Sequence, residues 1–117
     1  MTDVLEITSE DQMKAFLEDS SGLPGILFKY SPTCGISMAT EEHWNAFVES
    51  SPEKVRLARV DVLAARPAAR GISQWIGVLH QSPQVLVLQG ASVVRHTSHY
   101  SITEAWLNAA LAAVRTD

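Results

Sequence analysis

An apolar run, a proline break and the chain's single cysteine stand together at residues 25–37, which read GILFKYSPTCGIS. The first six residues, Gly25 to Tyr30, form a compact apolar run of strand length, which is typical of a strand buried on both faces. The run SPT at residues 31–33 breaks that strand, and a helix is expected from Cys34 to about Glu49. The apolar positions of this helix keep a period near 3.6 and are expected to be Ile36, Ala39, His43 or Trp44, Phe47 and Val48.

The other elements are expected from similar patterns on either side of this stretch. A strand is expected at Val4–Ile7, followed by a helix that starts at a capping box, residues 9–12, and stops near Gly22. Further elements are a strand at residues 54–62, a helix from Pro67 to about Trp75 ended by Gly77, a hairpin at residues 84–96, and a last helix from a second capping box, residues 101–104, to Val114. The order β-α-β-α-β-α-β-β-α predicts an α/β fold with a central mixed β-sheet flanked by helices on both faces.

Length and composition narrow the class of protein. The 117 residues fit one domain, residues 1–117, with 46% hydrophobic and 19% charged residues. One cysteine excludes an internal disulfide and a cysteine-based metal site within one chain, and it fits a reducing compartment. The net charge of −4 and the absence of a basic stripe disfavour nucleic-acid binding. No apolar run approaches the ~20 residues of a membrane span, and the acidic start lacks a signal peptide's basic region, so we expect a cytoplasmic protein with no membrane partner.

Cys34 lies where the predicted strand gives way to a predicted helix. Unpaired N–H groups and the helix dipole stabilise an anion at a helix start, so a cysteine there has a lowered thiol pKa. No Asp or Glu occurs within six residues of Cys34 on either side. The position therefore indicates a reactive thiolate; the alternative is a small buried hydrophobe, the common role of a free cysteine.

Pro83 directly precedes the strand expected from Gln84 to Leu88. The thioredoxin superfamily keeps a cis-proline at this place, facing the active cysteine, whereas the general frequencies of X–Pro bonds favour a trans proline that merely starts a strand. Within that superfamily, three segments resemble the monothiol bacilliredoxins of the YtxJ (BrxC) type. They fall in matching order and read FKYSPTCGIS at residues 28–37, HQSPQV at 80–85 and SHYSIT at 98–103. The thioredoxin-like fold that this resemblance implies covers nearly the whole chain.

The resemblance implies a monothiol thiol–disulfide oxidoreductase that removes bacillithiol, or a similar small thiol, from mixed disulfides on S-thiolated proteins. Cys34 would be the nucleophile. Ser37 stands where a dithiol enzyme has its resolving cysteine, either to hydrogen-bond the thiolate or as a polar residue of the first turn. The residues expected to contact the substrate are Thr33, Gly35, Ser82, Pro83 and His99. No cofactor or metal is expected beyond the small thiol as co-substrate, and an external thiol or a reductase must release Cys34.

Two positions depart from related patterns. Members of the family usually carry Cys-Pro-Ile-Ser, whereas this chain has Gly35, which is expected to loosen the first helical turn and leaves the reactivity of the thiol open. Phe28 stands six residues before Cys34, where dithiol thioredoxins place a buried aspartate. A buried carboxylate relay is therefore not expected.

Two other functions remain open at this stage. One is a non-catalytic thioredoxin-like adaptor in which Cys34 is a redox-sensing mark. The other is a monothiol glutaredoxin holding an iron–sulfur cluster, although that family's Cys-Gly-Phe-Ser run differs here at Ile36. His96 and His99 are expected to be surface residues rather than a metal pair, and His80 and His99 could border the thiol groove.

Overall fold

The computed structural model describes residues 3–19, 21–33, 35–52 and 54–114. The predicted order of strands and helices is confirmed, with one short 3₁₀ turn in addition. The strands are β1 (Val4–Ile7), β2 (Gly25–Tyr30), β3 (Arg56–Asp61), β4 (Gln84–Gln89) and β5 (Ser92–Ser98). The helices are α1 (Glu10–Leu17), α2 (Gly35–Ser50), α3 (Arg66–Ile76) and α4 (Glu104–Val114), and the 3₁₀ turn is η1 (His99–Ser101).

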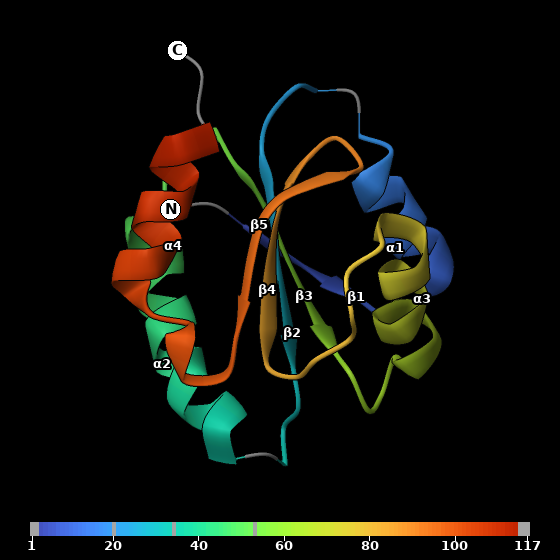
Figure 1. Ribbon diagram of the computed structural model, residues 1–117, viewed down its shortest axis with the longest axis horizontal. Coiled ribbons are helices and arrows are strands. Elements are labelled where there is room, and N and C mark those ends of the chain that lie inside the picture. The colour runs from blue at the N-terminus through green and yellow to red at the C-terminus, as the bar shows by residue number, and fades with distance from the viewer. Residues whose placement is uncertain (1–2, 20, 34, 53, 115–117) are drawn as a thin grey trace.

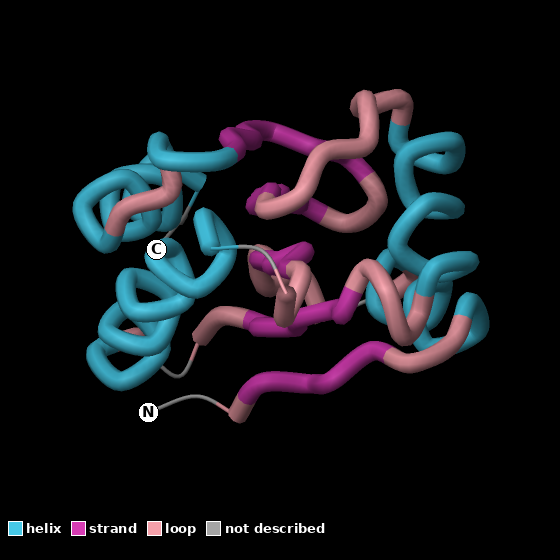
Figure 2. The backbone as a smooth tube through the Cα atoms, turned by 90° about the horizontal axis from the view of Figure 1, so that it is seen from below, coloured by secondary structure: helices cyan, strands magenta, loops and turns pink. Residues whose placement is uncertain are grey.

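The five strands form one mixed sheet in the order β1-β3-β2-β4-β5. Strands β1, β3 and β2 run parallel, whereas β4 is antiparallel to both β2 and β5. Helices α1 and α3 cover one face of the sheet, and α2 and α4 cover the other (Figures 1 and 2). The expected mixed sheet flanked by helices is therefore confirmed. None of the helices in the described part of the chain is long and apolar enough to span a membrane.

Strand β2 is the centre of this sheet, and all six of its residues are buried. Because successive side chains of a strand point to opposite faces, β2 contributes to two separate cores. Ile26, Phe28 and Tyr30 pack with α2 and α4, whereas Leu27 packs with α1 and α3. The apolar run in the sequence therefore forms the shared wall of both cores.

Capping boxes were predicted at the starts of α1 and α4, and the structure confirms the first but not the second. Ser9 caps α1, and its side chain accepts a hydrogen bond from the Gln12 N–H, as expected. The capping box predicted at residues 101–104 is wrong, because Ser101 belongs to η1. Thr103 caps α4 instead, its Oγ1 accepting from the Trp106 N–H at 3.1 Å.

The buried face of α2 differs from the predicted apolar face. Trp44 and Phe47 are buried as expected, but Ala39 is exposed and Ile36 is only half-buried. Ser37 and Thr40 occupy the buried face in their place, because their hydroxyl groups form hydrogen bonds with backbone groups inside the molecule. A hydropathy pattern does not detect buried polar residues of this kind.

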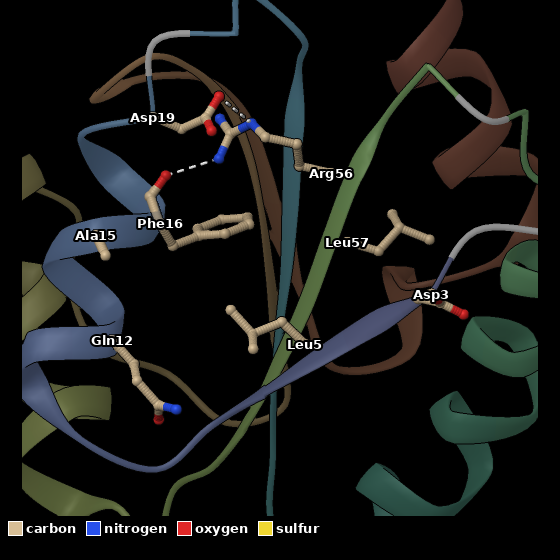
Figure 3. A pocket seen from close by; sticks show the side chains of 8 residues that line it. All are labelled: Asp3, Leu5, Gln12, Ala15, Phe16, Asp19, Arg56 and Leu57. Atoms are coloured by element: carbon tan, nitrogen blue, oxygen red, sulfur yellow. Dashed lines mark hydrogen bonds and ion pairs between the residues drawn. The ribbon is translucent and has the colours of Figure 1, made fainter.

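At the start of β3, Arg56 joins the sheet to the end of α1 (Figure 3). Its Nη1 donates to the Phe16 carbonyl at 2.7 Å, and its Nε lies 3.2 Å from Asp19 Oδ2. The guanidinium also lies 4.7 Å from the centre of the Phe16 ring. Gly25 on β2 leaves the room for this arrangement, because a Cβ atom there would lie 2.9 Å from Arg56 Nη2.

We expect Arg56→Met to lower the free energy of unfolding by about 2–3 kcal/mol, because it removes hydrogen bonds from a charged group and leaves the Phe16 carbonyl without its donor. Urea unfolding measures the change. The matched control is Glu6→Gln, which breaks the more exposed Arg59–Glu6 ion pair and should cost less than about 1 kcal/mol. Equal losses in the two variants would contradict a structural role for Arg56.

Candidate thiol-exchange site

Two parts of the chain that are distant in the sequence meet at one edge of the sheet: the connection from β2 to α2, and the start of β4. Strand β2 ends at Tyr30 and continues into residues 31–33, and α2 begins at Gly35. Lys29 is paired with Gln84, the first residue of β4, so Pro83 lies at the same edge as the end of β2. This edge is the lower one in Figure 1. Cys34 lies outside the residues that the structure describes, and its proposed role as nucleophile stays a prediction.

Ser37 is buried in the first turn of α2, with only 1% of its surface exposed. Its Oγ accepts a hydrogen bond from the Ser31 N–H at 3.1 Å. The hydroxyl thus ties the segment after β2 back onto the helix, and its own proton stays available for a further acceptor. Ser37 therefore connects the segment after β2 to the first turn of α2.

Pro83 forms the opposite side of this site. The Ser82-Pro83 peptide bond is cis, and the buried Pro83 carbonyl accepts a hydrogen bond from the His99 N–H at 3.0 Å. His99, at the start of η1, has a positive φ of 56°, which is uncommon for a residue other than glycine. The Ser82 Oγ is buried without a hydrogen-bond partner among the described residues. Ser82, Pro83 and His99, all predicted site residues, therefore lie next to one another.

The two remaining predicted substrate contacts are on the α2 side. Thr33 and Gly35 are exposed, and the Thr33 hydroxyl lies 3.4 Å from that of Ser31. A Cβ added to Gly35 would meet no atom within 4 Å. Steric crowding therefore does not explain why glycine stands at this position.

The core next to the site contains no carboxylate. Phe28 is fully buried, and its ring centre lies 5.2 Å from that of Trp44 and 5.7 Å from that of Tyr30. Among the described residues, the buried polar side chains are Lys29, Ser31, Ser37, Thr40, Ser51 and Gln84. Phe28 therefore belongs to an aromatic cluster with Trp44 and Tyr30.

Lys29 is a buried charged residue next to the site, and the sequence analysis assigned it no role. It is fully buried, and its Nζ lies 2.7 Å from His80 Nδ1 and 3.0 Å from Gln84 Oε1. Burial, with a smaller contribution from the positive charge of Arg70, lowers the pKa of Lys29 to about 8. A lysine inside a strand predicted to be buried on both faces was the signal that could have identified it.

Among the described residues, the histidines lie in separate surroundings. The described residues contain no group of three or more His, Cys, Asp and Glu side chains that could hold a metal ion. His43 has another role, since its Nδ1 accepts a hydrogen bond from the Glu104 N–H at the start of α4. His80 contacts the Lys29 ammonium through its Nδ1, and the His99 N–H donates to the Pro83 carbonyl.

Comparisons with known proteins agree with this geometry. Solved structures of the thioredoxin fold match the chain: a protein proposed to be an oxidoreductase with this fold (TM-score 0.80, 23% identity, 92% of each chain covered), and the thioredoxin of Fasciola hepatica (TM-score 0.77, 17% identity, 95% of this chain and 99% of that chain). Thioredoxin f from spinach chloroplasts matches with a TM-score of 0.76 at 18% identity, over 97% of this chain and 88% of that chain. The chain therefore has a thioredoxin-like fold. The family model described as monothiol bacilliredoxin BrxC matches residues 5–107, and the chain belongs to that family.

The lowered pKa of Lys29 gives a prediction for stability. The native ammonium loses its proton near pH 8, whereas an unfolded chain keeps it up to about 10.5. Between these values the unfolded state binds more protons, so this residue makes the free energy of unfolding rise with pH. Lys29→Met removes the effect, and we expect the difference in unfolding free energy, wild type minus variant, to increase from pH 7.5 to pH 9.5. Urea unfolding at both pH values measures it, and a difference that stays constant would contradict a desolvated ammonium.

Proposed function

We propose that this protein is a monothiol thiol–disulfide oxidoreductase that removes bacillithiol, or a similar small thiol, from mixed disulfides on proteins. The Cys34 thiolate attacks the small-thiol sulfur of the mixed disulfide. A new disulfide forms between Cys34 and the small thiol as the original disulfide breaks, and the protein leaves as its thiolate. The count of thiols and disulfides stays the same, so no outside oxidant is needed in this step.

One observation carries the proposal. The segment that contains Cys34 follows β2 at the same sheet edge at which Pro83 precedes β4, and hydrogen bonds hold both sides: Ser31 to Ser37 and His99 to Pro83. A thiol between these two sides would be open to an extended chain passing along the edge. Membership of the monothiol bacilliredoxin family supports the same chemistry.

The surroundings of the site favour a protein as the substrate. Three large apolar side chains on the segments next to it are strongly exposed: Met38 on α2 by 63%, Leu79 before Pro83 by 79%, and Tyr100 in η1 by 71%. A substrate protein bound at this edge would find apolar contact surface in these three side chains.

Release of the small thiol from Cys34 needs a second thiol from outside. The chain has one cysteine, so the adduct cannot be resolved by an internal disulfide. An external thiolate, from a free small thiol or a partner reductase, attacks the sulfur of the bound small thiol, and Cys34 leaves as the thiolate. The reaction cycle is then complete, with the external thiol oxidised.

The direct test uses a model protein with one cysteine, S-thiolated with bacillithiol. We expect the wild-type protein to take up the bacillithiol mass as the model protein loses it, and Cys34→Ser to show no transfer. Intact-mass spectrometry follows both proteins. A substrate carrying glutathione, run in parallel, identifies which small thiol is preferred.

Two results would contradict the proposal. The first is no transfer by the wild-type protein, or equal transfer by Cys34→Ser. The second is a single stoichiometric modification of Cys34 when a free thiol is present in excess, because an exchange catalyst must turn over repeatedly. The second result would instead support a redox-sensing adaptor.

A further inference from the structure

Lys29 is a buried cation that has no acidic partner among the described residues. The two ion pairs among the described residues join Arg56 to Asp19 and Arg59 to Glu6, and neither includes Lys29. Burying a charge that has no counter-charge is costly. An apolar side chain of similar length would pack at the same place without that cost, so packing alone does not account for an ammonium group here.

The hydrogen bonds of Lys29 all lead toward the segment before β4. Its Nζ contacts His80 Nδ1 and donates to Gln84 Oε1. Gln84 in turn binds the same segment twice: its Nε2 donates to the Leu79 carbonyl at 3.0 Å, and its Oε1 accepts from the Gln81 N–H at 3.4 Å. Lys29, His80 and Gln84, which we name the Lys29 clamp, thus connect β2 and β4 to residues 79–83.

Residues 79–83 have little else to hold them. They lie between α3 and β4, outside any helix or strand. In the described part of the chain, the one backbone–backbone hydrogen bond that this loop makes is from the His99 N–H to the Pro83 carbonyl. The position of the loop therefore depends on side-chain hydrogen bonds, and the Lys29 clamp supplies them from the buried side.

The charge states of the clamp suit these contacts near neutral pH. The pKa of His80 is lowered by burial and by the positive charges of Lys29 and Arg70, so its neutral ring accepts at Nδ1 from the Lys29 ammonium. The pKa of Lys29, about 8, keeps the ammonium as the main form at pH 7. The charged groups that shift the pKa values of Lys29 and His80 are thus Arg70 for both residues, and Lys29 for His80.

We propose that Lys29 is a positioning residue for thiol exchange: by binding His80 and Gln84 together, it holds Ser82 and Pro83 in place opposite the segment of Cys34. Lys29 acts through the loop and not by contact with the substrate. The expected effect on the rate of small-thiol transfer rests on the proposed function. The effect of Lys29 on the position of residues 79–83 does not, and it can be measured without any assay of activity.

The test compares Lys29→Met, which keeps the length of the side chain but removes its hydrogen bonds, with wild type. We expect the rate of small-thiol transfer from the thiolated model protein to fall by about 10-fold or more, because small misplacements of binding groups cost that much in rate. Alkylation of Cys34 by iodoacetamide, which needs no groove, should change less than about two-fold. Lys29→Gln, whose amide is still a donor, should recover part of the transfer rate.

Hydrogen exchange at the Gln81 amide gives a readout that does not depend on activity. We expect faster exchange at this amide in Lys29→Met, with exchange in the sheet unchanged. His80→Phe removes one hydrogen-bond partner of Lys29 at a half-buried position. It should also speed exchange at the Gln81 amide, and it replaces Lys29→Met in the test if that variant does not fold. Lys14→Met, which removes an exposed lysine on α1, is the matched control and should leave all three measurements at wild-type values.

The outcomes separate the possible failures. Unchanged transfer and unchanged Gln81 exchange in Lys29→Met would overturn the inference. A fall in alkylation as large as the fall in transfer would also overturn it, because the lysine would then act on the thiol itself. If wild type transfers no small thiol, the proposed function fails, and the exchange of the Gln81 amide alone then decides whether the clamp holds the loop.

Discussion

The burial of strand β2 is the constraint on which the rest of this structure depends. It lies between β3 and β4, and each of its six residues is buried. Because the strand alternates, one set of side chains fixes α2 and α4 against the sheet while the other fixes α1 and α3. The end of the same strand determines where the segment of Cys34 begins. The two cores and the candidate site are therefore set by one short stretch of chain.

The elements that are controlled by local chemistry could be predicted from the sequence. Ser9 caps α1, the left-handed Gly77 ends α3, and the hairpin turns at Gly90, each for a reason that is visible within a few residues. The capping box predicted at residues 101–104 was wrong because of a contact between distant segments. Thr103, not Ser101, caps α4 because residues 99–101 form a 3₁₀ turn whose first residue binds Pro83.

The candidate site could be predicted only in part for the same reason. The resemblance to the monothiol bacilliredoxins brought Ser37, Pro83 and His99 into one hypothesis, and the structure places them at one sheet edge. The sequence could not show which groups the Lys29 side chain contacts, because its partners His80 and Gln84 lie more than fifty residues away in the chain. On one face of β2, an aromatic cluster that includes Phe28 and Trp44 lies beside the candidate site. On the other face, the buried ammonium of Lys29 binds His80 and Gln84.

We propose that Cys34, which directly precedes α2 in the chain, is an activated nucleophile. The rate of Cys34 alkylation by iodoacetamide as a function of pH tests this proposal, with the same titration in urea as the unfolded reference. We expect a midpoint at least about one unit below the ordinary thiol pKa of ~8.5 in the folded protein, returning to ~8.5 in urea. A folded-state midpoint at or above ~8.5, or a thiol that reacts only after unfolding, would contradict it and return Cys34 to the role of a buried hydrophobe.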